Sequence, residues 1–421
     1  MLYECWRKIA GERAEELALA EMASGRRWRF CDLLREAEKE AAGGAPVAFP
    51  VGVSSGFILT VLRAWRSGGV VCPLDRLQQP PVLPSRLPAG IAHLKTSSAT
   101  TGAPRLIALT ASQMRADADN IVATMGLRPD WPNIGAISLA HSYGFSNLVL
   151  PLLLHGVPLI LAESALPESV RCAAKSCARV TLAAVPALWQ TWLSADAIPP
   201  NLGLAISAGS PLPLALEKSV FERSGLKIHN FYGSSECGGI AYDASVYPRA
   251  DAACVGAPLR NVAVSVGDDR CLEVRSEAVA LGYWPEPNPV LGGGVFKTSD
   301  LGEIAGGVIY LRGRAGDQIN VAGRKVSPEV IEEVLVNYPG VRACLAFGVP
   351  DTDEHRGETV VACVATEPGV SAESLKQFAL ARLPAWQVPR EWWMVDELPA
   401  SNRGKLSRLE WRKKFLERDR G

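Results

Sequence analysis

The sequence predicts an α/β protein, with a large N-terminal domain of layered β-sheets and helices and a small C-terminal α+β domain. The composition supports a large core, because hydrophobic residues make up 48% and charged residues 21% of the 421 residues. Short apolar runs alternate with helical patterns through most of the chain. Near residue 260 this alternation gives way to the period-2 patterns of hairpins. The change indicates a second domain, in which hairpins replace the regular alternation of strands and helices.

The N-terminal domain is predicted from apolar runs that are bounded by turn residues. Asp32 is a plausible N-cap for an amphipathic helix that ends at Gly43-Gly44. A β–α–β order follows, and later runs of four to eight apolar residues continue it. The strand-like runs are PVAFPVGV, VVCPLD, LIALT, IGAISLA, VPLILA, RVTLAAV and LGLAIS. Their nearly continuous apolar character predicts buried and largely parallel strands.

The C-terminal part is predicted from its turns and helix starts. Gly267-Asp268-Asp269 separates two alternating runs and predicts a hairpin. Ser327-Pro328-Glu329 has the residue types that begin a helix, and Ser371 opens another one. The Gly/Arg-rich turn GRAGD marks the boundary. We therefore expect domains at residues 1–316 and 317–421.

Charge and cysteine content exclude several classes of protein. Lys+Arg and Asp+Glu are both 44, so no global field attracts nucleic acid or an anionic membrane. The ten cysteines include no CxxC pair, which argues against zinc and predicts reduced thiols in a cytoplasmic protein. Residues 131–162 lack charges but are interrupted by Pro132, Pro151 and Pro158. We expect buried core there and no membrane span.

The segment SSATTGAPR lies between the strand-like runs IAHLK and LIALT. Its hydroxyls and glycine can wrap the oxygens of a phosphate chain; they belong to Ser97, Ser98, Thr100, Thr101 and Gly102. It is not a Walker loop, because no Gly-Lys-Ser/Thr follows. On the segment alone, a solvated turn is the commoner interpretation.

Two further segments carry candidate ligands. In NFYGSSECGG, the ring of Tyr232 can stack on a base and Glu236 can hold Mg²⁺; a plain turn with an exposed Glu is the alternative. Asp300 ends a strand-like run, where an Asp commonly accepts from a ribose diol, and Arg314 can pair with it. An ordinary surface salt bridge is the alternative. Near the C-terminus, Lys405 lies on a basic turn that can equally be a solvated helix end.

The order and spacing of these segments together resemble the adenylate-forming superfamily, which includes acyl- and aryl-CoA synthetases and the adenylation domains of peptide synthetases. The resemblance runs from about Val47 to Leu416. It implies that the hydroxyl loop grips the β- and γ-phosphates of ATP and that Glu236 holds Mg²⁺. It also implies an adenine and ribose site formed by Gly209, Ser210, Pro211, Asn230, Phe231, Tyr232, Gly233, Ser235, Asp300 and Arg314. In this pattern Asn230 reads the adenine amino group.

The resemblance also implies a mobile small domain. Asp317 matches the hinge, Lys405 matches the lysine that enters the site for adenylation, and Gly323 with Arg324 match the stretch that lines the approach of the thiol. Three positions depart from the usual pattern, namely Ala99 for Gly, Arg105 for Lys and Asn320 for a common Lys. The section before Ser97 is also shorter than is usual in the family.

The acid pocket implied by the resemblance is mostly apolar or small. His141 matches a gate beside the acyl group, although a His at a strand end is more often structural. The pocket list is His141, Phe145, Val185, Pro186, Ser207, Ala208, Gly238 and Gly239. No Asp stands in HSYGFSN to pair a substrate ammonium, and a buried ammonium without a partner is costly. An uncharged acyl or aryl acid is therefore expected.

The function implied is that of an ATP- and Mg²⁺-dependent ligase that makes an acyl-AMP and then a thioester with CoA or with the phosphopantetheine of an acyl carrier protein. Two alternatives stay open on the sequence. One is an enzyme that only loads a dedicated carrier protein. The other is a non-catalytic nucleotide- or acyl-binding homologue, suggested by the Ala99 and Arg105 departures and the shortened N-terminal part. The joint presence of Glu236, Asp300 and Lys405 argues against the second.

Overall fold

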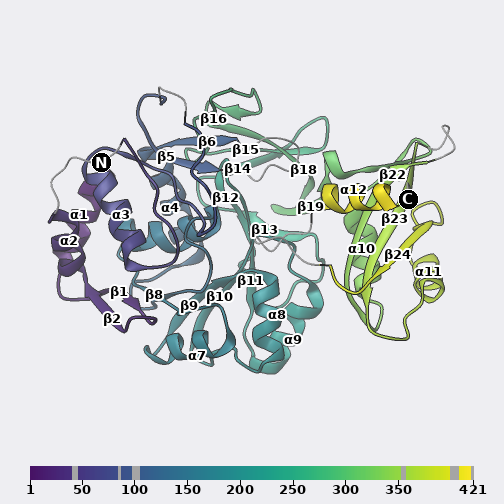
Figure 1. The fold of residues 1–421 in the computed structure, drawn as a ribbon, viewed down its shortest axis with the longest axis horizontal. Helices are drawn as coiled ribbons and strands as arrows, with labels where there is room; N and C mark the ends of the chain where they lie inside the picture. Colours follow the sequence, from purple (N-terminus) through teal and green to yellow (C-terminus); the bar gives the residue numbers. More distant parts are fainter. Residues whose placement is uncertain (40–45, 84–86, 97–104, 352–356, 399–406, 419–421) are drawn as a thin grey trace. The chain divides into compact units, whose positions relative to one another are not determined.

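A computed structural model describes residues 1–39, 46–83, 87–96, 105–351, 357–398 and 407–418 (Figure 1). The chain divides into two compact units. The first comprises Met1–Ser265, Glu273–Thr298 and Ile304–Tyr310. The second comprises Val266–Leu272, Ser299–Glu303 and Leu311–Gly421. The C-terminal stretch of the second unit thus begins at Leu311, a few residues before the boundary that we predict from the sequence.

The core of the first unit is a run of parallel strands, as the apolar runs predict. In spatial order these strands are β1 (Leu17–Glu21), β8 (Leu159–Leu161), β7 (Asn133–Gly135), β9 (Val180–Ala184), β10 (Leu202–Ser207) and β11 (Ile228–Ser234). Antiparallel strands flank this run: β2 (Arg26–Arg29) beside β1, and β12 (Gly238–Tyr242) and then β13 (Cys254–Pro258) beyond β11. Strand β9 is buried on both faces, as expected for a sheet that is covered on both sides.

A second sheet in the first unit has the order β16-β6-β5-β4-β3. Its strands are β3 (Val47–Ala48), β4 (Val70–Val71), β5 (Ile91–Thr96), β6 (Leu106–Thr110) and β16 (Gly282–Trp284). Strands β14 (Ala263–Val266), β15 (Cys271–Arg275), β17 (Leu291–Gly292), β18 (Val295–Ala305) and β19 (Val308–Arg314) complete the strands up to residue 314. The segment between β5 and β6 is the predicted hydroxyl loop, and it lies outside the described residues.

The helices of the first unit follow the apolar periodicity. They are α1 (Leu2–Glu12), α2 (Phe30–Glu38), α3 (Ser55–Arg66), α4 (Ala111–Met125), α5 (Ser142–Gly144), the π-helix η1 (Phe145–Val149), α6 (Leu150–His155), α7 (Pro167–Lys175), α8 (Pro186–Ser194) and α9 (Leu214–Ser224). The predicted N-cap at Asp32 is wrong. Helix α2 begins at Phe30, and Asp32 instead accepts a hydrogen bond from the backbone nitrogen of Arg29 at 3.2 Å. An acid on the third helical residue accepts from the N–H of the N-cap residue, whereas an N-cap side chain accepts from the N–H of the third helical residue.

The second unit is an α+β arrangement. Its three-stranded sheet consists of β22 (Val341–Pro350), β23 (Glu358–Thr366) and β24 (Glu391–Val395). The remaining elements are η2 (Ala315–Asp317), β20 (Ile319–Val321), β21 (Arg324–Val326), α10 (Pro328–Val336), α11 (Ala372–Leu380) and α12 (Arg408–Arg418). Ser327 and Ser371 are the N-caps of α10 and α11, which confirms both predicted helix starts. The apolar faces of α10 and α11 pack with β22 and β23 in one core.

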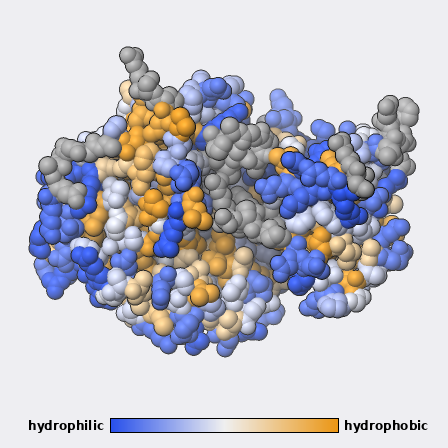
Figure 2. All heavy atoms as spheres, viewed as in Figure 1, coloured by the Kyte–Doolittle hydropathy of each residue, from blue (hydrophilic) through white to orange (hydrophobic). Residues whose placement is uncertain are grey.

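The apolar stretch at residues 131–162 is buried in the first unit, where Leu148, Leu152 and Leu153 are fully covered. Among the described residues, no helix has both the length and the apolarity that crossing a bilayer requires. All ten cysteines are free thiols. The face drawn in Figure 2 mixes hydrophilic and hydrophobic residues, and exposed apolar side chains such as Leu77 and Leu166 occur at separate points of the sequence.

Candidate active site

The site is centred on the turn between β11 and β12. Strand β11 carries Asn230 and Tyr232, and the chain reverses within a few residues to begin β12 at Gly238. The hydroxyl of Ser234 accepts a hydrogen bond from the backbone nitrogen of Glu236 at 3.2 Å, which holds the turn in a compact form. The turn therefore presents Ser235 and the Glu236 carboxylate at the carboxyl end of a parallel strand, where ligands of α/β sheets commonly bind.

The Glu236 carboxylate is held by a tyrosine from the second sheet. The hydroxyl of Tyr283, on β16, donates to Glu236 Oε1 at 3.0 Å. Burial, and then the charge of Glu236, raise the pKa of Tyr283, so the phenol stays protonated and remains a donor. The guanidinium of Arg105 lies 5.6 Å from the centre of the Tyr283 ring. Tyr283 thus lies between Glu236, in the turn after β11, and Arg105, which directly precedes β6.

The donor chemistry of this position fits Mg²⁺. A carboxylate has about four lone-pair sites, and the bond from Tyr283 uses one of them. No group of three or more His, Cys, Asp or Glu that could hold a metal occurs in the part of the chain that the structure describes. Mg²⁺ is commonly bound through one or two carboxylates together with substrate phosphates, and it does not require a cage of protein ligands. Glu236 would supply such a carboxylate.

Lys95 is a buried cation that the sequence analysis did not identify. It lies on β5, has 7% of its surface exposed, and donates to the hydroxyl of Ser142 at 2.9 Å. Burial lowers its pKa, while the charges of Asp117 and Glu236 act in the opposite direction. The available signal was a lysine inside the apolar strand IAHLK, directly before the hydroxyl loop.

Asp117 and two glycines form a close contact at the start of β12. A carboxylate oxygen of Asp117, on α4, accepts from the backbone nitrogen of Gly239 at 3.0 Å, and the other accepts from Ser146 at 2.6 Å. A Cβ on Gly238 would lie 2.0 Å from Asp117 Oδ1, and the backbone there has φ +71°. Gly238 of the predicted acid pocket is therefore required by the approach of Asp117 itself, whereas a Cβ on Gly239 would lie 2.5 Å from Leu259 Cδ2.

The end of β10 lies beside β11. Ser207 is paired with Asn230, so the following residues Ala208, Gly209, Ser210 and Pro211 leave the sheet next to the strand that carries Tyr232. Ser207 and Ala208 are buried, whereas Gly209 and Pro211 are exposed. The two segments predicted to face the adenine therefore lie at or near the carboxyl ends of two adjacent parallel strands.

His141 belongs to a small polar cluster. Its Nε2 lies 3.1 Å from Asp75 Oδ2, and the other oxygen of Asp75 accepts from the Ser138 hydroxyl at 2.7 Å. His141 immediately precedes Ser142, the residue that accepts from Lys95. The predicted acyl gate is therefore fixed by a carboxylate on one side and followed by the partner of a buried ammonium on the other.

Two other predicted pocket residues differ in burial. Phe145 is 1% exposed and packs on the ring of His93 with centroids 4.5 Å apart. Burial lowers the pKa of His93, which keeps this ring neutral. Val185 is half-buried and precedes Pro186, the first residue of α8. Phe145 thus contributes to the core beneath the site, and Val185 lies nearer the surface.

The second unit holds the remaining predicted residues that are described. Arg314 Nε donates to Asp300 Oδ1 at 2.8 Å, so the expected pairing of these side chains is present. Asp317 Oδ2 accepts from Arg408 Nη1 at 3.0 Å. Gly323 has φ +80° in the turn between β20 and β21, and the Arg324 guanidinium lies 5.6 Å from the centre of the Trp386 ring. Ser97, Ser98, Thr100, Thr101, Gly102 and Lys405 lie outside the described residues.

The chain is similar in sequence to several known proteins. The sequence pattern of the family described as AMP-binding enzyme matches residues 73–284, and that of the AMP-binding enzyme C-terminal domain matches residues 330–405. The chain is 30% identical to a feruloyl-CoA synthase of an Amycolatopsis species over 80% of its own length and 72% of that protein. It is 28% identical to a probable 2-succinylbenzoate–CoA ligase of Mycobacterium tuberculosis, covering 77% and 85% of the two chains.

Solved structures share the fold. The ATP-bound MatB from Rhodopseudomonas palustris superposes with a TM-score of 0.86 at 20% identity, covering 99% of each chain. The o-succinylbenzoate CoA synthetase of Bacillus subtilis in complex with its acyl-adenylate intermediate superposes with a TM-score of 0.84 at 19% identity, covering 97% of each chain. These likenesses confirm the predicted fold class.

Proposed function

Because the chain belongs to the AMP-binding enzyme family of adenylate-forming enzymes, we propose that it joins a carboxylic acid to the thiol of CoA at the expense of ATP, through an acyl-AMP intermediate. The observation that carries this proposal is that the predicted nucleotide-binding residues lie together at the carboxyl ends of two adjacent strands of the main sheet. There, β10 and β11 bring Gly209–Pro211, Asn230, Tyr232 and Glu236 together. A sheet edge that offers an aromatic ring, an amide and a carboxylate suits a nucleoside triphosphate and its cation.

The residues of the first unit have distinct proposed tasks. Tyr232 and the Gly209–Pro211 segment would sandwich the adenine, and Asn230 would accept from its amino group. Glu236, held by Tyr283, would bind Mg²⁺, which when present offsets negative charge on the phosphates. The hydroxyl loop would bind the β- and γ-phosphates. Orientation of the acid carboxylate toward the α-phosphorus then makes the displacement of pyrophosphate an effectively intramolecular step.

The residues of the second unit would act in sequence. We propose that Asp300, held by Arg314, accepts from the ribose hydroxyls, and that Lys405 stabilises the charge that develops at the α-phosphate. Rotation about Asp317 would then withdraw Lys405 and present Gly323 and Arg324 to the thiol. A mobile domain of this kind also keeps the acyl-adenylate, a reactive mixed anhydride, away from water.

An aromatic or medium-chain monocarboxylic acid is the proposed substrate class. His141 and Val185 offer a mostly apolar wall, and burial of apolar substrate surface contributes about 25 cal/mol per Å². The buried Lys95 donates to Ser142, the residue after His141, and its charge is offset by Asp117 and Glu236. The predicted pocket list contains no Asp or Glu to pair a substrate ammonium. The carboxylates that contact it have protein partners: Asp75 contacts His141 and Ser138, and Asp117 contacts Gly239 and Ser146. Amino acids and acetate should therefore be poor substrates.

The experiment is an acid panel assayed for AMP, pyrophosphate and thioester. The purified chain is incubated with ATP, Mg²⁺ and ferulate, benzoate, hexanoate, acetate or phenylalanine, with CoA or with a phosphopantetheinylated carrier protein. We expect AMP and acyl-CoA from the aromatic or medium-chain acids. Transfer to the carrier protein alone would identify a carrier-loading enzyme. Pyrophosphate release with phenylalanine but not with the other acids would refute the acid class, and release with none would refute the activity.

A further inference from the structure

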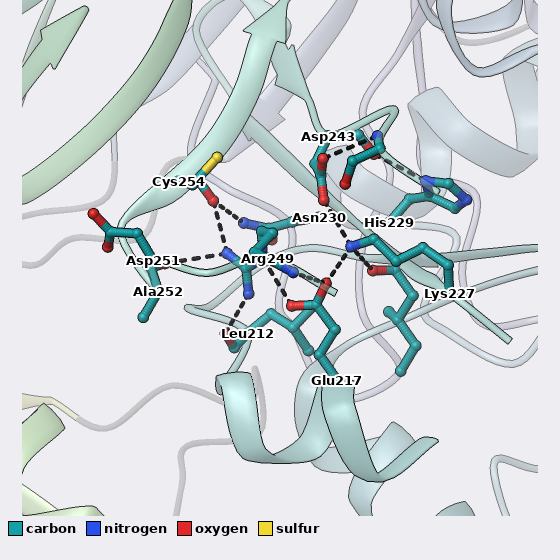
Figure 3. Close-up of polar contacts among 12 residues, drawn as sticks. Leu212, Glu217, Lys227, His229, Asn230, Asp243, Arg249, Asp251, Ala252 and Cys254 are labelled. Atoms are coloured by element: carbon teal, nitrogen blue, oxygen red, sulfur yellow. Dashed lines mark hydrogen bonds and ion pairs between the residues drawn. The ribbon is translucent and has the colours of Figure 1, made fainter. Parts of the chain in front are cut away.

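A buried network of four charged residues lies behind the nucleotide-facing end of β11. Its members are Glu217 on α9, Lys227 before β11, Asp243 after β12 and Arg249 (Figure 3). Their side chains are between 0% and 7% exposed. The proposed reaction uses none of them, although buried charges are costly unless they are fully paired.

The network has two arms that meet at Glu217. In one arm, Lys227 Nζ forms ion pairs with Glu217 and with Asp243 Oδ2, the latter at 2.7 Å. In the other arm, Arg249 Nε donates to Glu217 Oε2 at 2.8 Å, and the Arg249 backbone nitrogen donates to Oε1 at 3.0 Å. Glu217 therefore anchors both cations, and each cation can be removed while the other stays paired.

The other two nitrogens of the Arg249 guanidinium donate hydrogen bonds to backbone carbonyls. Nη2 donates to the carbonyl of Leu212 at 2.7 Å, and Nη1 donates to the carbonyls of Ala252 at 3.1 Å and Cys254 at 2.7 Å. Arginine can satisfy several acceptors at once because its donors form a rigid planar fork. The position of the Cys254 carbonyl is thereby fixed.

The Cys254 carbonyl is also the partner of Asn230. Asn230 Nδ2 donates to it at 3.1 Å, so the two lone pairs of this oxygen serve Arg249 and Asn230. Figure 3 shows the contacts from Arg249 and Asn230 converging on the Cys254 carbonyl oxygen. Because the side-chain amide is planar, a fixed Nδ2 also fixes the direction of Oδ1.

We propose that Arg249 is a positioning residue for nucleotide selection: through the Cys254 carbonyl it holds the Asn230 amide with Oδ1 directed to the base, as an acceptor for the exocyclic amine of adenine. The inference rests on the proposed function in one respect, the assignment of Asn230 to the base. An amide held in this sense accepts from a 6-amino group and opposes a 6-oxo group, which presents an oxygen. The network therefore serves discrimination between purines as well as packing.

The test is nucleotide binding measured by titration calorimetry with the Mg²⁺ complexes of ATP and ITP, which differ at position 6 of the purine. Binding needs no acid substrate. Arg249→Lys keeps a cation beside Glu217 but loses the fork that fixes Cys254. We expect the ratio of the ITP to the ATP dissociation constant to fall about tenfold, the size expected for one hydrogen bond of this kind. Asn230→Ala should lower the ratio similarly, and the double variant should lower it no further than Asn230→Ala alone.

Lys227→Met is the matched control. It breaks the other arm at Glu217 without touching Cys254, so it should reduce thermal stability while the ratio stays at the wild-type value. Arg249→Met is the second variant: it removes every donor from Arg249 to the Cys254 carbonyl and leaves Glu217 paired with Lys227. It should also lower the ratio about tenfold. This variant tests the proposal if Arg249→Lys is not recovered as folded protein.

An unchanged ratio in Arg249→Lys or in Arg249→Met would overturn the proposal, and so would an equal fall in Lys227→Met. A purely structural role predicts less folded protein but the same ratio in what is folded. A wild-type chain that binds ATP and ITP equally would remove the assignment of Asn230 and the inference with it. Failure to form AMP from any acid, with the ratio behaving as expected, would instead refute the proposed ligase activity and leave the positioning role standing.

Discussion

The two units each contain a cluster of charged side chains, and the clusters differ in balance. In the first unit, two cations, Lys227 and Arg249, face two carboxylates, Glu217 and Asp243, and all four are at least nine-tenths buried. In the second unit one cation, Arg408, faces three carboxylates: Asp317 at 3.0 Å, Glu329 at 2.9 Å and Glu332 at 2.8 Å. These four side chains are between 20% and 33% exposed.

This difference predicts different behaviour. We expect the balanced cluster of the first unit to keep one arrangement, and the acid-rich cluster of the second unit to change with pH. In the buried network of the first unit the charges balance and every charged side chain has a partner. This full pairing favours a single arrangement of β11 and its neighbours. An acid-rich cluster cannot satisfy all of its carboxylates, and burial raises the pKa of Glu332 to about 7. Asp317, the proposed hinge, belongs to this second cluster. The static cluster therefore lies with the proposed base-reading strand, and the responsive one lies with the residue proposed to turn.

The largest effect is expected at Lys405. Lys405→Ala should slow formation of acyl-AMP by about 10²–10³-fold, because it removes a donor to the charge that develops at the α-phosphate. Thioester formation from supplied acyl-AMP should survive, since the domain rotation withdraws Lys405 before that step. Stopped assays of each half-reaction measure the two rates. Lys413→Ala, at a side chain 77% exposed on α12, is the control. Equal loss in both half-reactions would show that Lys405 does not act in the formation of acyl-AMP alone.

The next effect is on the stability of the balanced network. Glu217→Gln leaves Lys227 and Arg249 without their shared anion, and breaking a buried pair costs about 3–5 kcal/mol of unfolding free energy. Urea unfolding followed by the fluorescence of the buried Trp189 and Trp192 would measure it. Glu222→Gln, at an exposed position on the same helix, should change stability by less than about 0.5 kcal/mol. A loss no larger than that of Glu222→Gln would mean that the network is not a stabilising unit.

A smaller effect is a pH dependence that belongs to the second unit. The pKa of Glu332 is raised from 4.5 to about 7, chiefly by burial and further by the charge of Glu329. The folded state then binds more protons than the unfolded state between these values, so stability falls as pH rises through this range. Glu332→Gln should remove that fall. Thermal unfolding between about pH 5 and pH 8 compares it with wild type and with the exposed Glu333→Gln. A wild-type slope that persists in Glu332→Gln would assign it to another group.

The smallest shift is expected for the stability of Lys95→Met. Burial lowers the pKa of Lys95, so its charged form destabilises the folded state at neutral pH. The cost is relieved as pH rises toward the unfolded value near 10.5. Lys95→Met should therefore be more stable than wild type at neutral pH, and the gain should shrink at high pH. Saturation with the acid should weaken in the same variant, because Lys95 orders Ser142 beside His141. A variant less stable than wild type at neutral pH would contradict this reasoning.

Local patterns predicted much of the fold. Most of the apolar runs became parallel buried strands, although LIALT became β6, which pairs antiparallel with both of its neighbours. The serines before α10 and α11 became N-caps, because this feature depends on neighbouring residues. The start of α2 was predicted three residues late, since an acid on the third helical residue and an N-cap carry the same local signal. Motif spacing identified Asp300 and Arg314 as a pair, and the structure places them together.

Features that depend on distant parts of the chain could not be predicted. Nothing near Lys95 in the sequence indicates Ser142, 47 positions away, as its partner. Gly238 and Gly239 were expected to line the acid pocket, but the space beside Gly238 is taken by Asp117 from α4, 122 positions before Gly239. The link from Arg249 through Cys254 to Asn230 passes through a backbone carbonyl, which carries no residue-specific signal at all.

The central claim, that the acid carboxylate attacks the α-phosphorus of ATP before the thiol arrives, is tested most directly by isotope transfer. The acid that proves active is labelled with ¹⁸O in its carboxylate and converted to the thioester with unlabelled ATP and CoA. The account predicts that the AMP released carries one ¹⁸O atom, detected by mass spectrometry, because the bridging oxygen of the acyl-AMP stays with the phosphate when the thiol displaces it. AMP without the label, or label recovered in inorganic phosphate, would contradict the account.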